Sequence, residues 1–92
     1  MYARMVIGEN VRIDAFAEMY RVDVLPKLEQ APGFRSAQLL AEDGGRTLVS
    51  LTLWDSRDEC LRYHSGPTYR SFVEQAHHLL DGELSVKLFE AV

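Results

Sequence analysis

The chain has 92 residues and a net charge of −4, and hydrophobic residues make up 47% of it. This length has room for one hydrophobic core, so we expect a single domain over residues 1–92 that would gain stability from association. Because the chain is acidic and has no cluster of Lys and Arg, nucleic acid is not expected as a partner.

The first predicted elements are a strand and a long helix. Residues 2–7 form a short β-prone run closed by Gly8, and apolar residues then recur every three or four positions from about 11 to 30. That spacing predicts a helix, with Asn10 as its N-cap. Pro26 lacks a backbone donor, so it should kink this helix or restart its last turns.

A β-hairpin is predicted next. A Pro-Gly pair at 32–33 ends the helix, and strand-like runs follow at 34–42 and 47–54. The Asp-Gly-Gly sequence at 43–45 between them is a typical hairpin turn.

A second helix and a last strand complete the chain. Ser56 and Glu59 have the spacing of a capping box, which predicts a helix start. This helix should be interrupted at 65–67 (Ser-Gly-Pro) and end at 81–82 (Asp-Gly), before a strand at 84–90. The order β-α-β-β-α-β predicts a ferredoxin-like α+β fold, a four-stranded antiparallel sheet with two helices on one face.

Both faces of the predicted sheet carry apolar residues, although two helices can cover only one. One phase of the strands is purely apolar: Ala3, Met5, Ile7, Val49, Leu51 and Leu53. The other phase mixes aromatic and polar groups: Tyr2, Arg4, Ser50, Thr52 and Trp54. An open sheet face should be polar, so we expect the apolar phase to contact a second copy in a homodimer. In the alternative, a monomer, the apolar phase faces the helices and Trp54, Tyr2 and Val6 are exposed.

A homodimer of this kind leaves the mixed phase facing the helices, where it would form a ligand pocket. The helix residues expected to face it are Phe16, Tyr20, Tyr69 and Phe72, together with His64 and His77. Trp54 would stack on a flat substrate or fill the core. Arg4 needs a partner, which would be a substrate phenolate or carboxylate, an acid of the same subunit, or water reached by snorkelling.

The histidines and the cysteine are weaker candidates. His64 precedes the helix break and could act as a base, or it could be an exposed helix-end residue. His77 lies nearer the apolar stripe than His78, which should face solvent. No residue cluster has metal-site spacing, so no metal is expected. Cys60 is interpreted as a packing thiol rather than a nucleophile.

The cellular location is inferred from what the sequence lacks. One cysteine cannot form an intrachain disulfide, and no apolar run approaches the ~20 residues of a membrane span. The N-terminal apolar stretch is too short for a signal peptide. We therefore expect a cytoplasmic protein without a membrane partner.

Four segments carry a family resemblance: Leu-Pro at 25–26, Pro-Gly-Phe at 32–34, Leu-Thr-Leu-Trp-Asp-Ser at 51–56, and the broken helix at 63–69. Together they resemble the antibiotic biosynthesis monooxygenase domain over essentially the whole chain. The resemblance implies a dimeric α+β barrel with a pocket in each subunit between sheet and helices. Activities in that family include cofactor-independent oxygenation of polycyclic phenols and quinols and oxidative haem degradation, and many members have no assigned reaction.

The resemblance can be carried over only position by position. Trp54 matches the strand-end Trp that lines the family pocket. The polyketide oxygenases have an Asn four residues before that Trp and a Tyr six after it, where this chain has Ser50 and Cys60, so the donor set is weakened. The iron-ligating His of the haem-degrading branch falls at Val73, which cannot ligate iron, and its first-strand Asn falls at Arg4.

The predicted function is cofactor-independent oxygenation of a small aromatic or quinol-type substrate by a homodimer. Trp54 would stack on the substrate, with Tyr20, Tyr69, Phe72, Ser50 and Thr52 around it. Arg4 would neutralise a developing anion, and His64 or His77 would accept the proton. No metal or flavin is implied. The alternative is a non-catalytic ligand-binding or stress-associated dimer of the same fold.

Overall fold

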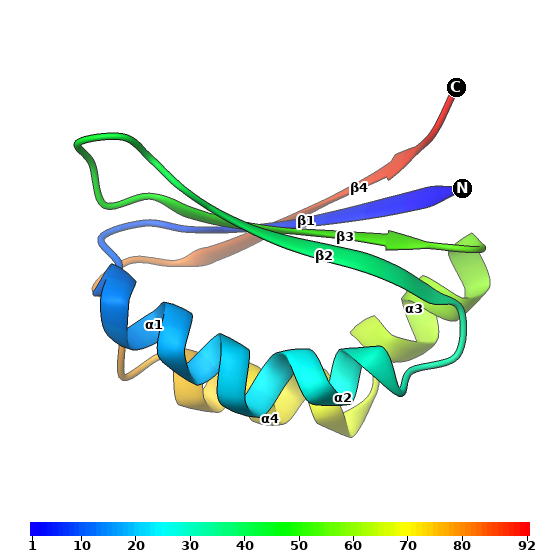
Figure 1. Cartoon of the computed structure of the whole chain (residues 1–92), viewed down its shortest axis with the longest axis horizontal. Helices are drawn as coiled ribbons and strands as arrows, with labels where there is room; N and C mark the ends of the chain where they lie inside the picture. Colours follow the sequence, from blue (N-terminus) through cyan, green and yellow to red (C-terminus); the bar gives the residue numbers. More distant parts are fainter.

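A four-stranded antiparallel sheet lies over a single layer of helices in the computed structural model, which describes residues 1–92 (Figure 1). The strands are β1 (Tyr2–Gly8), β2 (Phe34–Ala41), β3 (Leu48–Trp54) and β4 (Leu84–Glu90). Their order in the sheet is β2-β3-β1-β4, which is the ferredoxin-like arrangement. The predicted fold class is confirmed.

The first helix is divided into three parts. They are α1 (Ile13–Met19), the π-helical turn η1 (Tyr20–Val24) and α2 (Leu25–Glu29). Pro26 lies in the first turn of α2, where its missing backbone N–H is tolerated. The prediction that Pro26 restarts the last turns is therefore confirmed.

The start of α1 differs from the prediction. The helix begins after Arg12 and has no side-chain cap. Asn10 has a φ of 53°, and its carbonyl accepts a hydrogen bond from the Asp81 amide at 3.1 Å. Asn10 as the N-cap was wrong, because this residue belongs to the turn after β1, which is hydrogen-bonded to the loop between α4 and β4.

The second helix is broken as expected into α3 (Arg57–His64) and α4 (Pro67–Ala76). The predicted end at 81–82 is wrong, since α4 ends at Ala76 and Leu80 forms an isolated β-bridge with Val11. Ser56 Oγ accepts a hydrogen bond from the Glu59 amide at 3.3 Å, which caps α3. No helix of the chain has both the length and the apolar character needed to cross a bilayer.

The polar and aromatic phase of the strands faces the helices. The register pairs Arg4 with Thr52 and Tyr2 with Trp54, so these four residues share one face of the sheet. All of them are buried, and Trp54 is 0% exposed. The alternative orientation, with Trp54, Tyr2 and Val6 in solvent, is wrong.

The apolar phase lies on the open face of the sheet. Its members on β1 and β3 (Ala3, Met5, Ile7, Val49, Leu51 and Leu53) are half-buried by their neighbours, and no helix covers them (Figure 1). Leu40 pairs with Val49 and Phe89 pairs with Ala3, so the same face continues onto both edge strands. Leu40 and Phe89 are 48% and 45% exposed.

Candidate functional site

Arg4, in the middle of β1, is a buried charge without a counter-ion. It is 2% exposed, and its Nε donates a hydrogen bond to His64 Nδ1 at 3.1 Å. Its Nη2 is buried and has no hydrogen-bond partner. The salt bridges of the chain join Arg21 to Glu18 and Arg35 to Asp55, so no acid pairs with Arg4. The charge of Arg4 is therefore balanced neither by an acid of the same subunit nor by contact with solvent through snorkelling.

Aromatic rings take the place of a counter-ion around Arg4. The guanidinium carbon lies 4.1 Å from the centre of the Tyr69 ring and 5.6 Å from that of Tyr63. Tyr69 in turn stacks on His64, with ring centres 5.1 Å apart. Cation–π contacts stabilise the charge in part but offer no acceptor for the free N–H groups.

His64 is the last residue of α3 and is half-buried against this cluster. Burial, and secondly the charge of Arg4, lower the pKa of its imidazole below 6.5. His64 is therefore neutral near pH 7, with Nδ1 as acceptor and the proton on Nε2. His77 lies elsewhere, exposed at the C-cap of α4, and takes no part in the cluster.

Trp54 is the last residue of β3, on the face of the sheet that the helices cover. Its Nε1 donates to Thr52 Oγ1 at 2.9 Å, and Thr52 Oγ1 donates to the Arg4 carbonyl at 3.4 Å. One face of the indole meets Tyr63, with ring centres 5.3 Å apart and planes inclined by 33°. Phe34 packs edge-on against the indole at 5.6 Å. Trp54 is thus fixed at its polar end and stacked on its ring face.

A second buried polar pair joins the helix layer to the sheet. Tyr20 and Ser50 share a hydrogen bond of 2.9 Å between their hydroxyl oxygens. Burial raises the pKa of the Tyr20 phenol, although the Ser50 bond and the charge of Arg4 oppose this. Phe72 packs edge-on against Tyr20 at 6.4 Å. Cys60, also buried, has a thiol pKa raised by burial, which favours a packing role.

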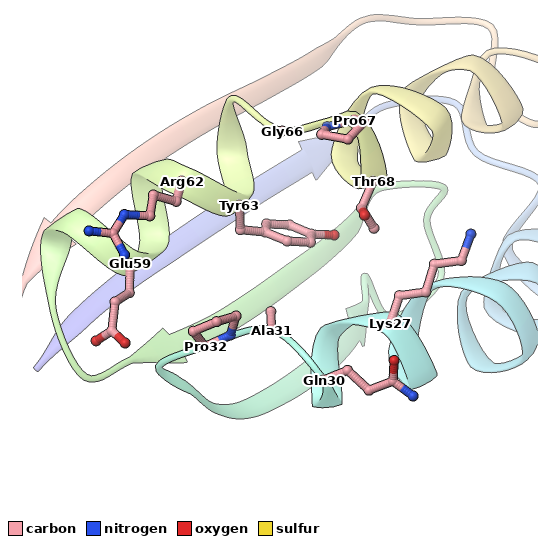
Figure 2. A pocket seen from close by; sticks show the side chains of 10 residues that line it. All are labelled: Lys27, Gln30, Ala31, Pro32, Glu59, Arg62, Tyr63, Gly66, Pro67 and Thr68. Carbon is pink, nitrogen blue, oxygen red and sulfur yellow. The ribbon is translucent and has the colours of Figure 1, made fainter.

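A groove of about 350 Å³ lies between α2 and the junction of α3 with α4. Its lining residues are Lys27, Gln30, Ala31, Pro32, Glu59, Arg62, Tyr63, Gly66, Pro67 and Thr68 (Figure 2). Tyr63, which extends from α3 toward α2 and the start of α4, is the inner wall of the groove and is 9% exposed. None of the site residues predicted from the sequence lines this groove, and Trp54, Tyr69 and Arg4 contact Tyr63 from the interior.

Tyr63 is the residue that the sequence reasoning missed. It contacts Trp54, Tyr69 and Arg4, and it also lines the groove. Burial raises the pKa of its phenol to about 12, despite the opposing charge of Arg4. A signal was present, because Tyr63 lies three residues after Cys60, on the buried side of the helix, and directly before the predicted break.

No group of three or more His, Cys, Asp or Glu side chains comes together as a metal site would require. The site is thus a cation among aromatic rings, with a neutral imidazole beside it. Such an arrangement can bind a planar molecule and stabilise a negative charge on it.

The comparisons with known proteins agree with this architecture. The family model described as antibiotic biosynthesis monooxygenase matches residues 11–75. No curated protein matches the chain. Among solved structures, the monooxygenase from the gene ActVA-Orf6 of Streptomyces coelicolor, in complex with nanaomycin D, superposes with a TM-score of 0.85 at 18% identity, covering 99% of this chain and 87% of that one.

Two further solved structures are similar over most of their length. SnoaB, a cofactor-independent oxygenase from Streptomyces nogalater, has a TM-score of 0.79 at 20% identity, covering 99% of this chain and 93% of that one. Rv0793 from Mycobacterium tuberculosis has a TM-score of 0.77 at 20% identity, covering 100% and 96%. At these identities the superpositions show a shared fold.

Proposed function

Because the chain belongs to the antibiotic biosynthesis monooxygenase family, we propose that it is a cofactor-independent monooxygenase for a small aromatic or quinol-type substrate. The fold shared with ActVA-Orf6 and SnoaB supports this class of reaction. The observation that carries the proposal is Arg4, which is buried, permanently charged and left with a free Nη2. An uncompensated buried cation is costly, and an ionised phenol would supply the missing acceptor.

Oxygenation without a cofactor requires the substrate itself to reduce oxygen, and an anion does so more readily than a neutral molecule. An anthrone that loses a proton from its ring CH₂ gives an enolate, which reduces O₂ and combines with it as a peroxide. Loss of water from the peroxide leaves a ketone, so anthrone and O₂ give anthraquinone and water. One oxygen atom stays in the product and the other leaves as water, and all four electrons come from the substrate.

Arg4 and His64 would act together in this step. Burial, and secondly the charge of Arg4, lower the pKa of His64, so the imidazole is neutral. Its unprotonated Nδ1 accepts the Arg4 Nε–H bond, so it would take the substrate proton as that bond is released. When a substrate anion pairs with Arg4, that charge is partly neutralised and the His64 pKa should rise. Anion formation and proton uptake therefore favour each other, while the aromatic rings of the cluster hold the substrate plane.

The active form would be a homodimer joined through the open face of the sheet. Met5, Leu51 and Leu53 lie on this face without a covering helix. An apolar patch of this kind on a sheet is typical of an interface with a second copy about a twofold axis. The pocket of each subunit would lie on the opposite side of its sheet.

Oxygen consumption tests the proposed reaction. Wild type, Arg4→Ala and Trp54→Phe would be compared with a panel of hydroquinones and anthrones, with exposed Arg57→Ala as the charge control. We expect turnover of at least one substrate by wild type and Arg57→Ala, and a loss of about 10²–10³-fold in Arg4→Ala. Equal rates in all four proteins would refute the role of Arg4.

A second candidate is a non-catalytic ligand-binding dimer of the same fold. It is favoured by the enclosure of Trp54, by the groove that stops at Tyr63, and by Ser50 and Cys60 in place of stronger donors. Ligand binding without oxygen consumption by any compound of the panel would support this candidate over the oxygenase.

A further inference from the structure

The Tyr63 ring occupies a slot in the interior, where the Trp54 and Tyr69 rings are inclined to it by 33° and 51°. Its centre lies 5.3 Å from that of Trp54 and 6.0 Å from that of Tyr69, and the Arg4 guanidinium carbon is 5.6 Å away. Two aromatic neighbours and a cation over the ring are surroundings that suit an aromatic anion. The resident phenol uses the stacking part of this site but leaves Nη2 of Arg4 without an acceptor.

The same ring borders the groove between α2 and the junction of α3 with α4. Figure 2 shows the ring reaching from the last turn of α3 toward α2 and the start of α4. Hydrogen bonds fix Tyr20 and Trp54, whereas no side-chain hydrogen bond holds the Tyr63 hydroxyl. The groove, of about 350 Å³, has room for the side chain if it rotates outward.

We propose that Tyr63 is the resident occupant of a ligand slot, and that an aromatic carboxylate or phenolate displaces it. The ligand enters through the groove as Tyr63 swings out, and its ring lies between Trp54 and Tyr69. Its anionic group accepts hydrogen bonds from Arg4 Nη2. This inference rests on the proposed function for the location of the site, and it adds the ligand class, the entrance and the residue that closes it.

Displacement is favourable because the ligand supplies Arg4 Nη2 with an anionic hydrogen-bond acceptor, which the Tyr63 phenol does not. Tyr63 remains a neutral phenol, since its pKa is raised to about 12, whereas a carboxylate is ionised at pH 7. The ligand regains the aromatic contacts of the phenol and adds a charge-assisted hydrogen bond. The groove is lined by Lys27 and Arg62 against one acid, Glu59, and this net positive charge attracts an anion to the entrance.

Occupation by Tyr63 also lowers the apparent affinity of the slot. The observed dissociation constant equals the intrinsic value divided by the fraction of molecules in which the slot is open. If the slot is open in about a tenth of the molecules, removing the ring tightens binding about tenfold.

Isothermal titration calorimetry with two matched probes tests the inference. 1-Hydroxy-2-naphthoate carries a carboxylate, and 1-naphthol lacks it. For wild type we expect the naphthoate to bind at least about tenfold more tightly than the naphthol. Arg4→Gln should remove this difference, and exposed Arg57→Gln should keep it.

Variants of Tyr63 show whether its side chain is displaced by the ligand or is a fixed wall of the pocket. Tyr63→Leu should bind both probes about tenfold more tightly, and Tyr63→Phe, which keeps the ring, should bind them as wild type does. Unchanged or weaker binding in a folded Tyr63→Leu would overturn the inference, as would the absence of naphthoate binding to wild type. Emission from the single tryptophan reports whether each variant is folded.

A measurement on wild type covers the case in which Tyr63→Leu does not fold. The chain has four tyrosines, so ¹³C-tyrosine labelling gives a small set of ring signals in NMR spectra. The Tyr63 signals should lose the ring-current shift from Trp54 as naphthoate is added, and bound ligand with unmoved signals would contradict displacement.

These experiments involve no turnover, so they can fail separately from the proposed reaction. If naphthoate displaces Tyr63 but no quinol supports oxygen consumption, the proposed reaction is refuted and the ligand slot is retained. If oxygen is consumed but Tyr63→Leu has unchanged probe affinity, the ligand slot is refuted and the proposed reaction is retained.

Discussion

Replacing Arg4 with methionine should make the protein more stable while abolishing its preference for an anion. Arg4 is 2% exposed, has no acidic partner, and has a buried Nη2 without a hydrogen bond. Methionine has a similar length and a flexible apolar side chain, so it can fill the same space without a charge. The change thus isolates what the buried charge costs the folded state.

The magnitude follows from the contacts of the side chain. The substitution removes the hydrogen bond from Nε to His64, which contributes about 1.5–3 kcal/mol, and a cation–π contact with Tyr69 of about 1–2 kcal/mol. It also removes the desolvation penalty of the ion, several kcal/mol, and the orphaned Nη2, about 1–3 kcal/mol. The two penalties overlap and together exceed the losses, so we expect a net gain of about 1–4 kcal/mol, the range typical of replacing buried charges by apolar side chains.

Urea unfolding and thermal unfolding measure this gain. For a chain of this length, 1 kcal/mol corresponds to a shift of about 4–8 °C in Tm. Protein concentration must be held equal, because association contributes to the stability of a dimer. The exposed control Arg57→Met should stay within about 0.5 kcal/mol of wild type. A loss of more than about 1 kcal/mol in Arg4→Met would refute the reasoning and make Arg4 a structural residue.

Three further predictions concern other parts of the molecule. The pKa of His64 is lowered in the folded state, so its contribution to stability is present above pH 6.5 and is lost as the pH falls through the folded pKa. The free energy of unfolding should therefore fall less over this range in His64→Gln than in wild type. Identical slopes in the two proteins would contradict the lowered pKa. Leu51→Glu on the open sheet face should give the mass of one chain in light scattering at micromolar concentration, while exposed Glu74→Lys stays dimeric; a dimeric Leu51→Glu would exclude this interface. Ser56→Ala should cost about 0.5–2 kcal/mol in urea unfolding because it removes the cap of α3, and an unchanged midpoint would show that the cap contributes nothing.

Much of the fold could be predicted from local pattern. β-Prone runs between turn signals identified the strands, and spacings of three and four identified the helices, because these features are local to the backbone. Pro26 and the break at 65–67 were placed correctly because Pro and Gly also act on the local backbone. Asn10 was misplaced as a cap, since its role depends on a hydrogen bond from Asp81, far along the chain.

The candidate site was only partly predictable. Strand phase correctly placed Arg4 and Trp54 on the helix side of the sheet. It could not show that Arg4 lacks an acidic partner or that Tyr63 fills the space beside Trp54. His64 contacts Arg4 although 60 residues separate them in the sequence, whereas His77 is exposed. Which histidine meets Arg4 depends on how α3 and α4 are rotated on the sheet, and local sequence does not specify that rotation.

The sequence by itself determined the order of the elements and which strand phase faces the helices. Both follow from short-range periodicity and from the need to bury apolar surface. Only the tertiary structure decided that the one buried cation meets aromatic rings and no carboxylate. Contacts between β1, α3 and α4 depend on how the broken helix packs across the sheet, and that packing is fixed by the whole interior at once.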